Sequence, residues 1–264
     1  MQTQAARPLA DVLEALREKG LRKGVGPMPG QVDGPPISTG HSRLDKALRT
    51  GGWPRGSLAL LDAPLGNGAT SLALASLAAC QSAGGLVAWL DLDGSFDPST
   101  AARSGVNLEW LLLARPRETD EAVELAAWLA RTRLLDVIVL DLGVAAVTSR
   151  TLSRLPELLT RFGGIVLAMA PAARDTVAGV AGIRVLLERR AWLSVGPDVV
   201  GERVEATVVR HRWALAGGST ELDLWFSEGR RVDALLRSLA APVEAREAHL
   251  PSGDEQPALR VLSA

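Results

Sequence analysis

The residues best suited to chemistry form a glycine-rich turn at positions 63–71 (APLGNGATS), between a short apolar segment and a helix-like segment. A turn in this setting is typical of the phosphate-binding loop G-x-x-x-x-G-K-[ST], whose backbone N–H groups and lysine hold phosphates. The candidate nucleotide-binding residues of this turn are Gly66, Gly68 and Thr70. Two positions depart from the pattern, because Ala63 replaces the first glycine and Ala69 replaces the lysine.

The departure at position 69 removes a charge. Only three of the 29 basic residues are lysines, and none follows Lys46, so an exchange of lysine for arginine would fit the composition. The residue found is alanine. A helix N-terminus still attracts an anion, and the hydroxyl of Thr70 remains available to a magnesium ion. Phosphoryl transfer, however, depends on charge stabilisation of the transition state. The sequence therefore predicts no ATP hydrolysis and no resident cofactor.

Carboxylates close two of the apolar segments. Asp141 ends the run VIVL, in the place of a Walker B aspartate, and Asp91 and Asp93 end LVAWLDLD. One interpretation is metal binding or water activation, since ligands bind beyond the carboxyl ends of parallel strands. The other is that these side chains cap loops and helices, and without the lysine we favour it. Asp141 is kept with the loop residues as a candidate ligand.

A pair of arginines lies near the end of a later strand-like segment. Arg210 and Arg212 alternate, so both side chains are predicted on one face of the strand. Together they would hold an acidic partner surface or DNA phosphates. A solvated strand face with two exposed arginines is the alternative, and both interpretations remain open.

Composition excludes several other classes. One cysteine, Cys80, allows no intramolecular disulfide, and the three histidines lack metal-ligand spacing, so no metal site is predicted. The net charge of −1 argues against a protein held on nucleic acid by bulk charge alone. Neither a signal peptide nor an apolar run of roughly 18 residues is found, which predicts a soluble cytoplasmic protein without membrane contact.

Alternating strand-like and helix-like segments must position these residues. The strand-like segments are 57–62, 86–92, 137–140 and 164–170, and the helix-like segments are 69–82, 119–133 and 149–161. Near-continuous apolar strands separated by helices predict an α/β fold whose mostly parallel sheet is covered on both faces. Three later strand-like segments have no helices between them: 182–188, 203–212 and 220–226. The sheet is therefore predicted to end in antiparallel strands.

The chain is predicted to have four parts. Residues 1–23 contain an amphipathic helix at 9–23, and residues 24–36 form a Gly/Pro-rich linker. The helix is interpreted either as a cap on its own domain or as an arm that docks elsewhere. The core spans 37–239, and residues 240–264 form a flexible C-terminal tail. Its apolar end is interpreted as a frayed terminus or as a peptide-docking motif.

An ordered series of short motifs resembles the core of the RecA recombinase family. The matching pieces are ISTG at 37–40, LD at 44–45, GGWPRG at 51–56, LDLD at 90–93, FDP at 96–98, GV at 105–106, DVIVLD at 136–141, VAA at 144–146, VVRHR at 208–212 and WFSEG at 225–229. The resemblance covers roughly residues 37–229. It implies a phosphate-loop NTPase-type fold, with Arg210 and Arg212 in place of two lysines that reach a neighbour's nucleotide.

The departures from RecA concern one catalytic apparatus. Ala69 stands at the lysine position, Asp93 at that of the catalytic glutamate, and Thr100 at that of the ring that stacks on adenine. An asparagine–glutamine pair that senses nucleotide in RecA is represented by Ala170 and Pro171. The helix at 149–161 also leaves little room for the first DNA-binding loop, and 172–182 is a short second loop. Any DNA contact is therefore expected to be weak.

A short RecA-like chain with these losses is similar to the ImuA family of translesion-synthesis accessories. That resemblance implies a non-catalytic scaffold that works with an ImuB-like Y-family polymerase homologue, with RecA, and with an error-prone replicative-type polymerase. Self-association of copies is left open.

Two rivals to this scaffold are kept. One is an active ATP-dependent recombinase with an altered nucleotide site, its cation supplied in trans by Arg210 or Arg212. The other is a modulator that caps or enters a RecA filament.

Overall fold

The computed structural model describes residues 34–195, 197–226 and 259–263. Within these ranges nine strands form one sheet, in the order β3-β2-β4-β5-β1-β6-β7-β8, and β9 pairs with β6 beside this path. The strands are β1 (Leu58–Asp62), β2 (Val87–Asp91), β3 (Leu111–Ala114), β4 (Val137–Asp141), β5 (Ile165–Met169), β6 (Ile183–Val195), β7 (Asp198–His211), β8 (Ser219–Trp225) and β9 (Leu259–Ser263).

The first six strands run parallel to one another, and the last three pair antiparallel. Strands β1, β2, β4 and β5 are buried along their whole length, as near-continuous apolar runs require. Their alternate residues point into two separate cores, one on each face of the sheet. The predicted fold class is confirmed.

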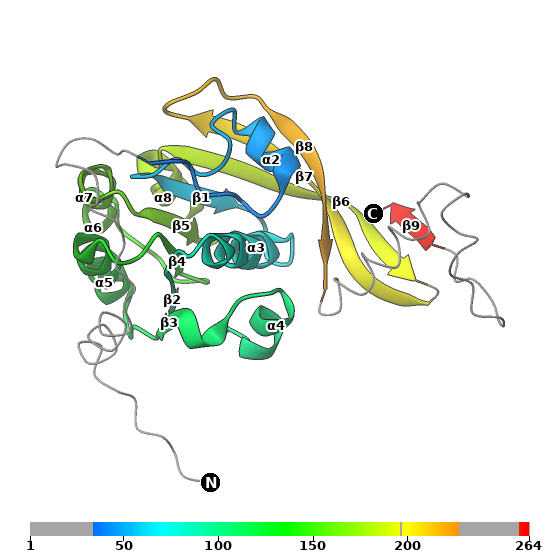
Figure 1. The fold of residues 1–264 in the computed structure, drawn as a ribbon, viewed down its shortest axis with the longest axis horizontal. Helices are drawn as coiled ribbons and strands as arrows, with labels where there is room; N and C mark the ends of the chain where they lie inside the picture. The colour runs from blue at the N-terminus through cyan, green and yellow to red at the C-terminus, as the bar shows by residue number, and fades with distance from the viewer. Residues whose placement is uncertain (1–33, 196, 227–258, 264) are drawn as a thin grey trace, which may run out of the picture.

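Helices cover both faces of the parallel part of the sheet (Figure 1). One core includes α2 (Ser42–Ala47), α3 (Ala69–Ser82) and α4 (Pro98–Arg103). The other includes α5 (Thr119–Thr132), α6 (Ser149–Leu152), α7 (Leu155–Phe162) and α8 (Arg174–Val180). A single 3-10 turn, η1 (Leu108–Trp110), precedes β3 among the described residues. None of the described helices is long and apolar enough to span a bilayer.

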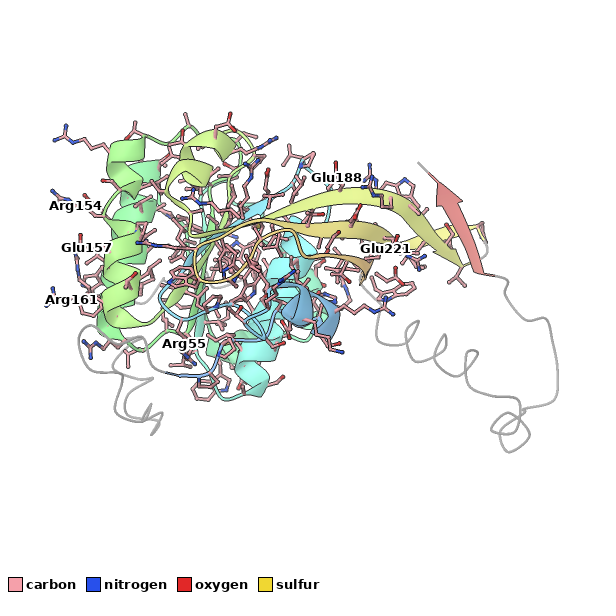
Figure 2. The ribbon with its side chains drawn as sticks, turned by 90° about the horizontal axis from the view of Figure 1, so that it is seen from above. Arg55, Arg154, Glu157, Arg161, Glu188 and Glu221 are labelled. Atoms are coloured by element: carbon pink, nitrogen blue, oxygen red, sulfur yellow. The ribbon has the colours of Figure 1, made fainter. Side chains whose placement is uncertain are left out.

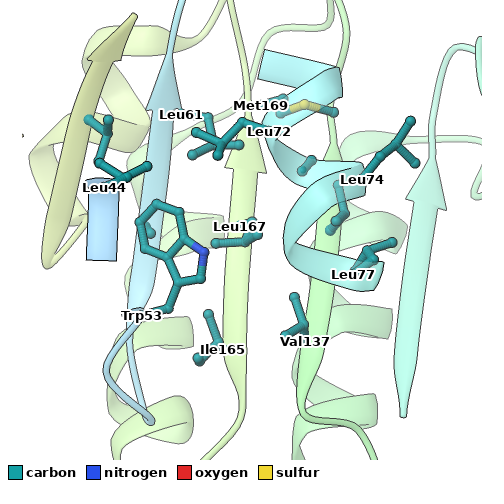
Figure 3. Close-up of a cluster of buried hydrophobic side chains, with 14 of the residues drawn as sticks. Leu44, Trp53, Leu61, Leu72, Leu74, Leu77, Val137, Ile165, Leu167 and Met169 are labelled. Carbon is teal, nitrogen blue, oxygen red and sulfur yellow. The ribbon is translucent and has the colours of Figure 1, made fainter. Parts of the chain in front are cut away.

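Trp53 anchors the core between the sheet and α3 (Figure 3). Its ring is fully buried, and its Nε1 donates to Ser76 Oγ on α3 over 3.0 Å. Ser76 Oγ in turn donates to the carbonyl oxygen of Thr39 over 3.0 Å. A buried indole N–H needs such a partner, and this chain of bonds fastens the segment before α2 to the helix that follows the loop.

The predicted helix at 149–161 is wrong in one respect, because the structure has two helices there. α6 ends at Leu152 and α7 begins at Leu155. Pro156 lies in the first turn of α7, where a missing N–H costs nothing, but it cannot continue a preceding helix. Helix α7 presents Arg154, Glu157 and Arg161 to solvent, away from the sheet (Figure 2).

The hairpin of β6 and β7 is longer than predicted. The sequence indicated strands at 182–188 and 203–212, whereas β6 has 13 residues and β7 has 14. Its distal half projects beyond the helix-covered body (Figures 1 and 2). This half was missed because its charged residues interrupt the apolar pattern by which strands were predicted. Ion pairs across the strands, such as Arg190 with Glu205, accommodate those charges. Strand β3 and helices α2 and α4 were not predicted either.

The prediction of a flexible tail at 240–264 is corrected for its last residues. Leu259–Ser263 forms β9, which pairs antiparallel with Ala191–Val195 of β6. The physical reason is that β1 ends at Asp62, opposite Leu186, so β6 continues with an edge whose backbone groups need partners. The predicted helix at 9–23 lies outside the described residues, as does the linker apart from 34–36.

Candidate functional site

The predicted phosphate loop lies where expected, between β1 and α3. Gly66 and Gly68 have φ values of +79° and +84°, a region that favours glycine. Gly68 is the residue before α3, and its carbonyl accepts from Leu72 N over 2.9 Å. Thr70 is exposed in the first turn of α3. The loop therefore presents the free N–H groups of a helix N-terminus, which can attract an anion.

The antiparallel strands β6, β7 and β8 pack against this loop through side chains that the sequence did not point to. Arg189 Nη1 on β6 donates to the carbonyl oxygen of Gly66 over 3.2 Å. A Cβ placed on Gly68 would lie 2.4 Å from Leu224 Cδ1 and 3.2 Å from Glu202 Oε1. We call Arg189, Glu202 and Leu224 the loop clamp. It joins the loop to three antiparallel strands and leaves no space for a side chain at position 68.

Glu202 is an unusual member of the clamp because it is a buried acid. Its side chain is only 2% exposed, and its Oε2 has no hydrogen-bond partner in the described structure. Arg189 Nη1 lies 3.8 Å from that oxygen, and the Arg189 guanidinium stacks 4.0 Å above the Trp192 ring. Burial raises the pKa of Glu202, while Arg189 opposes the rise. The guanidinium that contacts the loop is therefore shared with a carboxylate.

Three carboxylates gather at the carboxyl ends of β2 and β4. Asp91 is fully buried and accepts from Ser95 N over 2.9 Å and from Phe96 N over 3.2 Å. Arg115 Nε, 3.2 Å away, adds a third bond. These contacts make Asp91 a cap for the loop that follows β2, which supports the structural interpretation for that residue.

The other two acids flank Gly143. Asp93 Oδ2 accepts from Val144 N over 3.2 Å, and Asp141 Oδ1 accepts from Gly143 N over 3.2 Å. Burial raises the pKa of Asp141 to about 6, with the charges of Asp91 and Asp93 adding to the rise. Among the residues that the structure describes, no three His, Cys, Asp or Glu side chains are arranged to hold a metal.

The two arginines do not act as one pair. Arg210 Nη1 donates to the carbonyl oxygens of Ala178 and Gly179, at 2.8 and 3.4 Å, at the end of α8. Arg212 is exposed, and its guanidinium lies 6.0 Å from the Trp213 ring. Ile183, opposite His211, neighbours Ala59 near the start of β1. The arginines thus lie at the end of β1 opposite to the phosphate loop of the same chain.

An ion-pair cluster beside the loop was also missed. Asp62, the last residue of β1, is buried and binds two arginines. Arg184 Nη2 lies 2.6 Å and Arg174 Nε 3.1 Å from its carboxylate. Arg174 begins α8, which fills most of the predicted second loop at 172–182. An acid at the end of an otherwise apolar strand was the available signal, but its partners are more than 100 residues away.

Comparison with known proteins identifies the fold's relatives. The RecA N-terminal domain model matches residues 25–154. RecA of Chlorobium limicola is 30% identical over 83% of this chain and 73% of that protein. RecA of Corynebacterium efficiens is 29% identical over 87% of this chain and 69% of that protein. The crystal structure of the RadB recombinase superposes with a TM-score of 0.53, at 22% identity, over 71% of this chain and 95% of RadB.

Sequence and geometry identify the same family of folds. The match at 25–154 includes the loop, Asp91, Asp93 and Asp141, and the relatives' similarity extends well beyond it. The superposition with RadB supports the order of strands independently of sequence. On these grounds the chain belongs to the RecA family.

Proposed function

We propose that this chain is a non-catalytic accessory of DNA-damage-induced translesion synthesis and mutagenesis, similar to the ImuA proteins. In that role it binds an ImuB-like Y-family polymerase homologue, RecA, or both, and it supports an error-prone replicative-type polymerase. The observation that carries the proposal is Ala69, which begins α3 at the position of the phosphate-loop lysine. A loop without that ammonium group lacks the charge that phosphoryl transfer requires.

The loop clamp supports a structural use of the loop. Arg189 donates to Gly66 and is close to Glu202, so its charge is partly neutralised. Glu202 adds negative charge beside Gly68, near the helix terminus where an anion would bind. Both contacts hold the loop against the hairpin, and the carboxylate of Glu202 disfavours a polyphosphate there. In this proposal the loop is retained because it connects β1 to α3 and to the hairpin.

ATP turnover tests the non-catalytic part. We expect the purified chain, with and without single-stranded DNA, to release phosphate from ATP no faster than the variants Thr70→Ala and Asp141→Ala. Turnover above those two variants would overturn this part of the proposal, because both remove candidate ligands of a nucleotide and its metal.

Partner binding tests the accessory part. A groove of about 1010 Å³ lies between α5 and the α6–α7 pair, and its lining includes Trp128 together with Arg131 and Glu124. Trp128 is 41% exposed, unusual for so large a ring. We expect an ImuB-like homologue to co-purify with the full chain, and Trp128→Ala to weaken that binding about tenfold. If the chain instead co-sediments with RecA filaments and does not bind the polymerase homologue, the filament modulator is favoured.

The terminal segments provide a further test of the same proposal. Deletion of residues 1–30 is expected to weaken self-association or partner binding, because the helix at 9–23 would dock outside its own domain. A pull-down with and without residues 240–264 shows whether the tail contributes. If deletion of residues 1–30 changes neither self-association nor partner binding, the docking-arm interpretation is refuted.

An ATP-dependent recombinase with an altered site is the second candidate. The observation that favours it is Arg212, an exposed guanidinium on the residue after β7, away from the loop of its own chain. Only a neighbour could use it at a nucleotide. This candidate predicts that magnesium-ATP raises the melting temperature and that Arg212→Ala abolishes the rise. Unchanged melting temperatures at millimolar ATP would remove it.

A further inference from the structure

Strand β6 has two edges that are used differently. One edge pairs with β7 from Ile183 to Val195. The other pairs with β1 only as far as Leu186, because β1 ends there at Asp62. Beyond this point β9 takes over the edge from Ala191 to Val195. No described strand pairs with the four residues in between, on that side.

The occupied part of the edge has the properties of a strand-docking site. Ala191, Leu193 and Ser194 are each no more than 5% exposed, although they lie in the projecting half of the hairpin. Buried N–H and C=O groups must be paired, and β9 supplies five antiparallel partners, from Ser263 opposite Ala191 to Leu259 opposite Val195. Main-chain pairing of this kind accepts any extended segment with suitable residues, whichever chain it comes from.

The chain that leads to β9 is much longer than its own ladder requires. Trp225 ends β8 opposite Gly201, and Gly201 lies opposite Leu193, so β8 and β9 flank the same part of the hairpin. Three interstrand spacings, about 14 Å, separate them. The 33 residues from 226 to 258 (258 − 225) connect them. About five residues would span that distance, whereas 33 extend to roughly 110 Å.

We propose that the edge at Ala191–Val195 is a docking site for the C-terminal strand, Leu259–Ser263, of a second copy of this chain. The ladder made in trans is identical to the one made within a chain, so exchange loses no contact. The connecting chain is long enough to reach a neighbouring body. Reciprocal exchange between two copies closes a two-fold dimer, and one-way exchange links copies in a row. Because pairing within a chain competes, exchange increases with protein concentration.

Disulfide trapping in the full chain tests the site. Ala191 and Ser263 are register partners, and both are small. Partners in an antiparallel pair have Cβ atoms about 4.5–5.5 Å apart, close to the separation in a disulfide. One preparation carries Ala191→Cys and the other, with a different tag, carries Ser263→Cys. Mixed at about 100 µM and oxidised, they are expected to form at least fivefold more cross-linked heterodimer than a collision control.

The collision control replaces Ala191→Cys by Val144→Cys. Val144 is 65% exposed and follows β4, three strands away from β6. A cysteine there is readily accessible, so its cross-linking yield gives a high baseline for random collisions. Wild-type protein, which keeps the buried Cys80, controls for the native thiol. Val261→Pro in the Ser263→Cys chain places a proline at the middle of the paired strand, where its ring disfavours pairing, and is expected to abolish the fivefold excess.

Three outcomes would overturn the proposal. The first is a heterodimer yield equal to the collision control while the double variant Ala191→Cys, Ser263→Cys closes within one chain, which means that the edge is used only in cis. The second is failure of the double variant to form any disulfide, which means that Leu259–Ser263 does not occupy the edge. The third is an excess that survives Val261→Pro, because it would not depend on the ladder.

Discussion

The parallel body and the projecting hairpin of this molecule are built by different means. In the body, β1, β2, β4 and β5 are buried from end to end, and helices shield both faces. In the hairpin, β6 and β7 alternate buried and exposed positions. The body therefore depends on the hydrophobic effect, while the hairpin adds ion pairs and ring contacts to a thinner apolar layer.

The charges of the hairpin show the difference most clearly. Glu188 lies opposite Glu205, and Glu205 lies opposite Glu221, so three acids form a row across three strands. Figure 2 shows Glu188 and Glu221 on this part of the sheet. Like charges directly opposite destabilise a sheet, and Arg190 offsets the row by pairing with Glu188 and Glu205. The stability of this part of the sheet therefore depends on Arg190.

The loop belongs to both regions, because it leaves the body at Asp62 and is held by the loop clamp of the hairpin. Side chains from β6, β7 and β8 lie against it. Contacts with these antiparallel strands therefore help to hold the loop's conformation. The following predictions test that division, beginning with the largest effect.

Removing one tryptophan from each region tests the contrast directly. Trp53→Ala is expected to lower the free energy of unfolding by about 4 kcal/mol, because it opens a cavity in the closed core and leaves Ser76 without its donor. Trp192→Ala is expected to lower it by only about 1–2 kcal/mol, since that ring is partly exposed. Urea unfolding measures both. Equal losses would mean that the hairpin is as strongly packed as the body.

The junction between the regions is tested at two glycines with similar backbone angles. Gly68→Ala combines left-handed strain with a contact against Leu224 and is expected to cost about 3 kcal/mol. Gly66→Ala has the same strain, but nothing lies within 4 Å of the new Cβ, so about 1 kcal/mol is expected.

Leu224→Ala provides the control for this pair. Combined with Gly68→Ala, it opens space for the new methyl group. The double variant should therefore lose less free energy of unfolding than the sum of the losses of the two single variants. Strict additivity would show that the hairpin does not hold the loop.

The body was largely predictable from the sequence, and the hairpin was not. Continuous apolar runs indicated β4 and β5, and small apolar residues indicated α3 with its observed bounds, Ala69–Ser82. These signals are local. The distal half of β6 carries Arg189 and Arg190, whose partners include Gly66 of the loop and Glu205 of β7. These contacts join distant segments of the chain, which neither composition nor periodicity records.

The site was predictable in position but not in surroundings. The pattern of glycines located the loop, and the ends of apolar strands located Asp91 and Asp141. The loop clamp was missed, although one signal was present. Glu202 shares its strand face with Val204 and Ala206, so an acid occupies an inward position in an apolar alternation. Its partner Arg189 could not be inferred, because the register of β6 against the loop is a tertiary property.

A pH dependence distinguishes two of the buried acids of the body, Asp141 and Asp91. The pKa of Asp141 is raised from near 3.8 to about 6, so the folded state holds a proton that the unfolded state releases. The stability contributed by this group is present at pH 4 and is lost as pH rises through 6. The free energy of unfolding of Asp141→Asn is therefore expected to exceed that of wild type by about 2–3 kcal/mol at pH 7.5, and to equal it at pH 4.

Asp91→Asn is the matched control for that experiment. Asp91 accepts two backbone N–H bonds and one from Arg115, so the amide removes a charge-assisted acceptor and should destabilise the fold at both pH values. Urea unfolding at pH 4 and pH 7.5 measures both variants. A stabilised Asp91→Asn at pH 7.5 would mean that the two acids share one role.

The smallest expected effect concerns the two arginines at the base of the hairpin. Arg210 holds the carbonyl oxygens that end α8, so Arg210→Ala should lower the free energy of unfolding by about 1 kcal/mol. The Arg212 side chain is exposed, with its guanidinium 6.0 Å from the Trp213 ring. Arg212→Ala keeps the backbone bond to Gly182 and should change the free energy of unfolding by less than about 0.5 kcal/mol. Differential scanning calorimetry resolves the two. If Arg212→Ala weakens partner binding while stability stays constant, the two arginines have different roles. Arg210 then stabilises the body, and Arg212 contacts a partner. Equal stability losses would place both in the body and remove Arg212 as a contact for a partner.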